Sequence, residues 1–179
     1  SEPWVQIAVY GLYAAGEFCV GLWAASLFIE KRGLPTGTAG FLAALYYGSI
    51  TAGRIVSGLF ADRIGNRRMV RLGLAAAALG AALLALPSLQ AAAAAVLLLG
   101  FGFAPVYPCL MHETPRRFDE RTYRTVIGFQ VGAACLGASY LPAAVGFVLA
   151  RTSLALLPAF LVLFIAAMAG MTAFLDRRT

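Results

Sequence analysis

Long stretches without charged residues dominate the chain, and their lengths predict its elements. Five such runs together contain only two charged residues, Glu17 and Arg54. A helix needs about 20 apolar residues to cross the ~30 Å hydrocarbon core of a bilayer, so four of the runs fit one helix each. The third run is about twice that length and is interrupted by Pro87, which favours two helices. The runs are 3–29, 33–61, 72–111, 125–150 and 152–175.

The pattern therefore predicts an all-α membrane protein with six transmembrane helices, organised as one domain over residues 1–179. Hydrophobic residues make up 61% of the chain and charged residues 12%, whereas soluble domains average about 25% charged residues. This composition excludes a soluble protein. The predicted spans are 4–29, 38–61, 69–86, 89–112, 123–150 and 154–175.

Basic residues are concentrated on one side of the predicted bundle. Ten arginines fall on the side of the two termini, against three basic residues on the other side. Because Lys and Arg accumulate in cytoplasmic loops, we expect both termini in the cytoplasm and the protein in the plasma (cytoplasmic) membrane. These anchors explain the net charge of +6, so no nucleic-acid partner is expected. The ten are Arg63, Arg67, Arg68, Arg71, Arg116, Arg117, Arg121, Arg124, Arg177 and Arg178, and the three are Lys31, Arg32 and Arg151.

Small residues and prolines predict how the helices pack. Gly128 and Gly132 have the GxxxG spacing, and we expect them at a tight contact between helices. Pro105 removes a backbone donor and permits a kink, although proline is also common in ordinary membrane helices. The cysteines lie in apolar runs, which predicts buried thiols and no disulfide framework. They are Cys19, Cys109 and Cys135.

The stretch after the second predicted span is the most informative part of the chain. Its glycines permit close helix approach at Gly58 and a sharp turn at Gly65, and Asp62 can meet the positive N-terminus of a partner helix. The arginines that follow can pair with carboxylates or carbonyls. The residues of this loop signature are Gly58, Asp62, Arg63, Gly65, Arg67 and Arg68.

This stretch resembles the loop signature of the major facilitator superfamily, Gly-x-x-x-Asp-Arg-x-Gly-x-Arg-Arg, with Asn66 where a basic residue is usual. The resemblance implies a twelve-helix fold in two halves, with the substrate cavity between them. It also implies that the loop links the halves and steadies the outward-open state. Other segments look like the C-terminal half of fucose permease-like sugar transporters. They are residues 16–17, 53–54, 104–108, 114–117 and 127–131.

A short internal repeat indicates how such a half is built. Residues 58–63 and 146–151 each end a predicted helix and place an arginine five residues after a glycine. Two three-helix units of opposite membrane orientation would give this pattern. We therefore expect a 3+3 inverted-repeat bundle, completed by a second six-helix bundle, either an N-terminal half or a second copy.

Glu17 is the strongest candidate for a proton-binding residue. It lies near the middle of the first span, where a charge costs at least ~2.5–3.5 kcal/mol. It can carry a proton between the two sides of the membrane, or it can be a protonated carboxyl that hydrogen-bonds neighbouring helices. Arg54 is predicted about 10 Å nearer the termini, which favours a structural or gating role over direct pairing with Glu17.

Four further side chains are candidates for a polar substrate cavity. Amide and hydroxyl groups bond sugar hydroxyls and aromatic rings stack on a sugar's apolar face, although aromatic residues are also common packing residues. No cofactor or metal is expected, because no Cys or His spacing suits a metal site. The four candidates are Gln130, Tyr107, Tyr46 and Trp23.

The leading hypothesis is half of a secondary active transporter that moves a small polar solute, plausibly a sugar in symport with protons, by alternating access. The partners would be the lipid bilayer, the second bundle and the solute. A membrane scaffold or an isolated fragment that only folds and dimerises is the alternative. An intramembrane enzyme is disfavoured, because no nucleophile with a base, paired aspartates or metal cluster is found.

Overall fold

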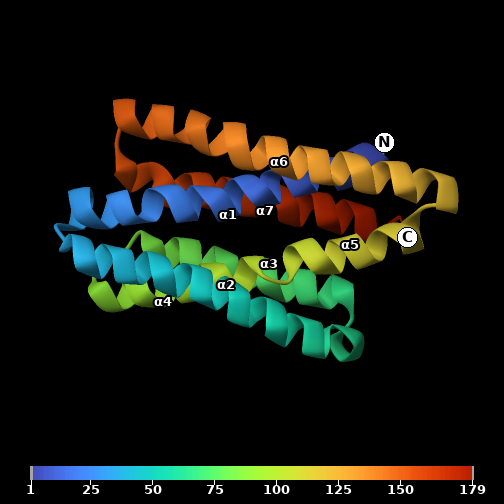
Figure 1. Cartoon of the computed structure of the whole chain (residues 1–179), viewed down its shortest axis with the longest axis horizontal. Coiled ribbons are helices and arrows are strands. Elements are labelled where there is room, and N and C mark those ends of the chain that lie inside the picture. The colour runs from blue at the N-terminus through green and yellow to red at the C-terminus, as the bar shows by residue number, and fades with distance from the viewer. Residues whose placement is uncertain (1, 179) are drawn as a thin grey trace.

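A computed structural model describes residues 2–178 of the chain as an all-helical bundle (Figure 1). The long helices run side by side, and both ends of the chain lie at the same end of the bundle, which is called here the terminal end. The elements are α1 (Glu2–Arg32), α2 (Thr36–Ile64), α3 (Asn66–Leu84), α4 (Leu89–Phe103), α5 (Val106–Arg117), α6 (Glu120–Arg151), the 3₁₀ helix η1 (Leu154–Leu156) and α7 (Leu157–Asp176).

Each predicted span overlaps one helix, with ends that differ by up to three residues, except at the fourth and the sixth. The fourth consists of two helices, and the sixth begins in η1 and continues in α7. The span 89–112 is divided between α4 and α5, and Pro105 stands at the N-cap of α5. Pro105 lacks a backbone N–H, so it cannot continue the hydrogen-bond ladder of α4. The division between α3 and α4 also follows the sequence, because Pro87 precedes Ser88, whose hydroxyl accepts a hydrogen bond from Ala91 N at 3.1 Å and caps α4.

The helices pack in two related groups. α1 packs against α6 and α7, while α4 packs against α2 and α3. The two groups meet where α3 contacts α7 and where α1 contacts α2. The two groups correspond when the chain is divided into two three-helix units, α1–α2–α3 and α4/α5–α6–α7. The contacts of α1 with α6 and α7 then match the contacts of α4 with α2 and α3. This is the packing of an inverted repeat, in which each three-helix unit contributes its first helix to the other unit.

Glycines allow close helix contacts, but not where the GxxxG spacing predicted them. No heavy atom lies within 4 Å of the position a Cβ would take at Gly128 or Gly132, because both face outward from α6. The close contacts lie elsewhere: a Cβ at Gly102 would lie 2.6 Å from the Gly73 carbonyl oxygen of α3, and one at Gly137 would collide with Gly11 of α1. Within the described residues, Gly128 and Gly132 therefore form no tight contact between helices.

The helices differ in how apolar they are and in which residues they expose. Four crossings are long and apolar enough to span a membrane by length and composition alone, namely 2–32, 89–117, 120–151 and 154–176. The helix α2 is not among them, since it is rich in glycine, threonine and tyrosine, and α3 begins with three arginines. The exposed side of α2 carries Thr51 and Arg54, and that of α6 carries Ser139 and Tyr140.

Candidate functional site

The two charged residues of the predicted spans form an ion pair in the middle of the bundle. Arg54 Nη2 of α2 lies 3.3 Å from Glu17 Oε1 and 3.4 Å from Glu17 Oε2 of α1. Glu17 is about 22 Å from either end of α1, so the pair is far from both membrane surfaces. Direct pairing corrects the expectation that Arg54 binds elsewhere.

The reach of the arginine side chain explains this correction. The expectation placed the end of the helix at residue 61, but α2 continues to Ile64, which moves Arg54 about 5 Å further from the terminal end. The helix α1 also begins two residues earlier than predicted, at Glu2, which moves Glu17 about 3 Å in the same direction. The offset along the helix axis is therefore still ~7 Å, which an extended arginine side chain can reach.

Two tyrosine hydroxyls hydrogen-bond Glu17, one at its carboxylate and the other at its backbone carbonyl. Tyr13 donates to Glu17 Oε2 and accepts a hydrogen bond from Arg54 Nη2 at 3.3 Å, and Tyr46 donates to the Glu17 carbonyl oxygen at 2.9 Å. The Glu17 side chain is 12% exposed and the Arg54 side chain is 50% exposed. The carboxylate is therefore largely shielded from solvent, whereas half of the Arg54 side chain is accessible.

Gln130 and Tyr46 do not line an open cavity in this structure. Gln130 is fully buried, and its Nε2 donates to Thr114 Oγ1 at 3.0 Å. Gln6 Nε2 lies 3.4 Å from the same oxygen, so the three side chains join α1, α5 and α6. Tyr46 is 1% exposed and its ring packs on Tyr47. Both were predicted to bind solute, and both instead hydrogen-bond neighbouring helices.

Tyr107 and Trp23 are partly exposed and belong to aromatic contacts between helices. The Tyr107 ring stands 5.1 Å from the Tyr10 ring and 5.9 Å from the Tyr13 ring, measured between centroids. Trp23 Nε1 donates to the Pro142 carbonyl oxygen at 2.9 Å. Tyr107 thus lies next to Tyr13 and the ion pair, whereas Trp23 ties α1 to α6.

A polar groove of about 440 Å³ runs from Arg54 to the signature loop between α2 and α5. Gly58 and Asp62 line it from α2, and His112 lines it from α5. Gly58 was predicted to admit a neighbouring helix, but no described heavy atom occupies the space of its missing Cβ. The ion pair and the loop are therefore two ends of one surface feature.

The signature loop forms the tight turn between α2 and α3. Gly65 has φ +87, a conformation that favours glycine and lets α3 begin one residue later. Arg63 and Arg68 are exposed. Arg67 Nε lies 3.1 Å from Glu113 Oε2 of α5, and Asn66 donates to Glu113 Oε1 at 3.1 Å. Asn66 therefore donates a hydrogen bond to a carboxylate, at the position where the loop signature of the major facilitator superfamily has a basic residue.

A buried charge cluster at the terminal end was missed from the sequence. Glu113 is 4% exposed, and Asp176 of α7 accepts from Arg71 Nη2 at 2.9 Å and from Arg117 Nη2 at 2.7 Å. Arg67 joins the two acids, since its Nε is also 3.7 Å from Asp176 Oδ1. The i,i+4 spacing of Arg67 with Arg71 is a signal for one shared helix face. The members are Arg67, Arg71, Glu113, Arg116, Arg117 and Asp176.

Metal and thiol chemistry receive no support among residues 2–178. No three His, Cys, Asp or Glu side chains come together in that range as metal ligands would. Cys19 and Cys109 are buried thiols, but Cys135 is exposed on α6, which corrects the prediction of burial. The charged groups at mid-bundle among the described residues are Glu17 and Arg54, with Tyr13 and Tyr46 hydrogen-bonded to Glu17.

Comparison with known proteins identifies the family. The family model of the Major Facilitator Superfamily matches residues 6–179. Two solved structures of a mutant of the peptide transporter POT, in complex with sulfate and with alafosfalin, have TM-scores of 0.80 and 0.74 at 16% and 18% identity. Each match covers 94% of this chain and 37% of the transporter chain. No curated protein gives a significant match.

The two structural matches, at their low identity, show the fold alone. The chain spans little more than a third of the length of the matched transporters, which corresponds to one six-helix half. The family model covers nearly the whole chain and so shows the family. This chain belongs to the Major Facilitator Superfamily.

Proposed function

We propose that the chain is half of a secondary active transporter that moves a small polar solute by alternating access. The Glu17–Arg54 pair carries this proposal, because it lies halfway along the bundle and half of the Arg54 side chain is exposed. A purely structural ion pair in hydrocarbon is expected to be shielded, since exposing a charge there is costly. A half-exposed guanidinium at that depth implies a water-filled cavity beside it.

Proton coupling is the proposed use of Glu17. Its carboxylate accepts from both Tyr13 and Arg54, so protonation removes the charge that holds the guanidinium in place. Arg54 is then free to bind an anionic or hydroxyl group in the cavity. Binding of proton and solute would in this way be linked through one ion pair.

A sugar is the proposed solute, supported by the resemblance to fucose permease-like carriers and by the tyrosines around the pair. Tyr47 and the partly exposed Tyr107 offer hydroxyls and ring faces of the kind that bind sugars. A small peptide is the second candidate. It is favoured by the fold of the matched peptide transporter and by the pair itself, since Arg54 and Glu17 match the opposite ends of a zwitterion.

A second six-helix bundle is proposed to cover the exposed sides of α2 and α6. Both helices expose polar and small residues there, and the Glu17–Arg54 pair opens on the same side as α2. Small residues at a membrane surface permit close approach of another helix. The partner would be an N-terminal half or a second copy, with both termini of this chain in the cytoplasm of the plasma membrane.

Uptake into proteoliposomes tests the proposal. The purified chain, whose mass in detergent is first measured, is reconstituted and supplied with labelled sugars or labelled dipeptides under an inward proton gradient. Accumulation of either solute above that in empty liposomes supports transport and identifies the solute class. Folded, dimeric protein that accumulates neither class contradicts the proposal and favours the scaffold alternative.

A further inference from the structure

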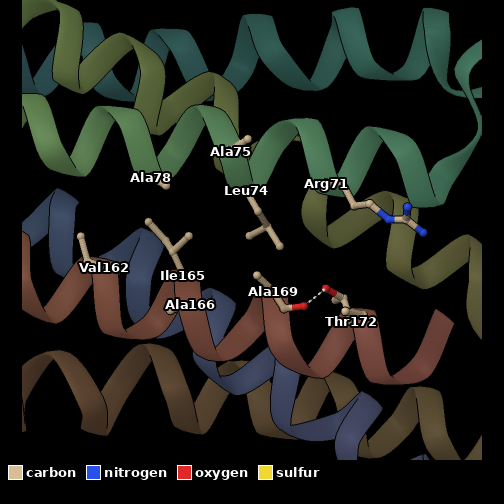
Figure 2. Close-up of a pocket in the computed structure, with 10 residues that line it drawn as sticks. Arg71, Leu74, Ala75, Ala78, Val162, Ile165, Ala166, Ala169 and Thr172 are labelled. Atoms are coloured by element: carbon tan, nitrogen blue, oxygen red, sulfur yellow. Dashed lines mark hydrogen bonds between the residues drawn. The ribbon is translucent and has the colours of Figure 1, made fainter. Parts of the chain in front are cut away.

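An apolar groove lies between α3 and α7, whereas the ion pair of the candidate site lies on α1 and α2. Its volume is about 410 Å³, within the ~300–1,000 Å³ typical of small-molecule sites. Leucine, valine, isoleucine and alanine side chains form its walls, and Arg71 closes one end (Figure 2). The walls are Leu74, Ala75, Ala78, Val162, Ile165, Ala166, Ala169, Thr172 and Ala173.

The groove faces hydrocarbon. Between residues 72 and 84, the exposed residues of α3 are leucine and alanine alone. The exposed residues of α7 between 159 and 174 are likewise all apolar. The exposed polar residues Thr51, Arg54, Ser139 and Tyr140 are on α2 and α6 instead. A surface of aliphatic side chains in a membrane protein is the one that lipid covers.

The groove has the length of one leaflet. Along α7 it extends from Val162 to Ala173, which is about 16 Å at 1.5 Å per residue. The hydrocarbon core is ~30 Å thick, so half of it, the reach of one acyl chain, is about 15 Å. Because α7 ends at Asp176 and α3 begins at Asn66, the groove lies in the half of the bundle next to the terminal end.

The polar end of the groove is positively charged. Arg71 donates to Asp176 at 2.9 Å, but its side chain is 63% exposed and a guanidinium has further N–H donors. The surrounding cluster contains four arginines, Arg67, Arg71, Arg116 and Arg117, against two carboxylates, Glu113 and Asp176. An anion at this end therefore meets an excess of positive charge.

We propose that the α3–α7 groove binds one acyl chain of an anionic phospholipid whose phosphate is held by Arg71. Both parts of the groove match such a molecule: the aliphatic walls take the chain, and the guanidinium at the membrane surface takes the headgroup. The lipid would bridge the two inverted repeats, since α3 belongs to one and α7 to the other. It would contact neither Glu17 nor Arg54.

Lipid retention in native mass spectrometry tests the headgroup contact. The chain in mild detergent is incubated with phosphatidylglycerol or with phosphatidylcholine of the same acyl chains, and the fraction carrying lipid is measured. We expect about tenfold tighter retention of phosphatidylglycerol. Arg71→Gln should remove that preference, whereas the matched control Arg68→Gln, an exposed arginine on the same helix, should keep it. Equal retention of the two lipids by the unmodified chain would overturn the proposal.

A groove-filling variant tests the acyl contact and remains decisive if Arg71→Gln fails to fold. Ala169→Phe places a ring in the groove and should reduce retention of both lipids several-fold. Ala82→Phe adds the same ring to an exposed position of α3 outside the groove and should change nothing. Inorganic phosphate should not displace the lipid. Equal retention by the two Phe variants, or displacement by phosphate alone, would contradict a lipid site.

Discussion

Two groups of charged residues hold this bundle together, and they differ in exposure and in number of partners. At mid-bundle, one carboxylate meets one guanidinium that is half exposed. At the terminal end, Glu113 and Asp176 are almost enclosed, and Arg117, one of their four arginine partners, has a side chain only 2% exposed. The enclosed cluster has the features of a structural clamp on α3, α5 and α7, while the open pair can exchange partners.

The largest stability effect is expected from breaking the enclosed cluster. Asp176→Asn leaves Arg117 buried beside a neutral side chain, and removing one partner of a buried pair costs about 3–5 kcal/mol. The thermal unfolding of the purified variant in detergent would show this loss. Glu120→Gln, which removes an exposed pair with Arg124, is the control and should cost under about 0.5 kcal/mol. Equal losses would remove the distinction between clamp and surface pair.

A smaller effect on stability is expected at mid-bundle. Arg54→Gln should lower the free energy of unfolding by less than about 1 kcal/mol, because the Arg54 side chain is half exposed and Tyr13 still donates to Glu17. The same thermal assay measures it. A loss as large as that of Asp176→Asn would mean that the mid-bundle pair is also a clamp.

Access to the polar groove between α2 and α5 should change when Asp62, which lines it, is replaced. Asp62→Ala removes a charge from the loop signature and should alter the balance of inward- and outward-facing states by about 1 kcal/mol, seen as a roughly fivefold change in labelling rate. The probe is a cysteine at position 112, on the α5 side of the groove, in a protein whose exposed Cys135 is replaced by serine. Unchanged labelling would exclude a role for Asp62 in gating.

The smallest effect concerns an exposed carboxylate at the same end as the clamp. The pKa of Asp119 lies below its usual value because its side chain accepts a hydrogen bond from Thr122 at the start of α6. Its capping therefore contributes fully above the unfolded pKa of about 3.9 and is lost as the pH falls through the lower folded value.

Amide exchange in residues 120–125, corrected for intrinsic rates, would detect this loss as faster exchange at pH 3 than at pH 6. Asp119→Ser, whose cap does not titrate, is the control and should show no such change. An equal change in the serine variant would assign the effect to another group.

Much of the fold follows from features that are local in the sequence. The long uncharged runs gave the crossings, Pro87 and Pro105 gave the two breaks around α4, and Gly65 gave the turn of the signature loop. These features act within a few residues of where they occur. The sequence alone was therefore sufficient to place the crossings, although it predicted one helix over 89–112 with a kink permitted at Pro105, where the structure has two helices.

The contacts between helices were not predictable in the same way. Helices in lipid are apolar on all sides, so no amphipathic pattern showed that Gln130 points inward and that Gly128 and Gly132 point outward. The Glu113–Asp176 cluster joins separate helices and depends on their packing. The Glu17–Arg54 pair was missed because the axial offset between the two residues was judged too large, whereas an extended arginine side chain covers it.

The central claim is that Glu17 exchanges a proton when solute crosses the bundle beside Arg54. Proteoliposomes loaded with a pH-sensitive dye and supplied with the transported solute, without an imposed gradient, test it directly. The account predicts acidification of the lumen by the unmodified chain and none by Glu17→Gln, while Glu30→Gln, an exposed acid on the same helix, behaves like the unmodified chain. Solute-dependent acidification by the Glu17→Gln variant would contradict the account.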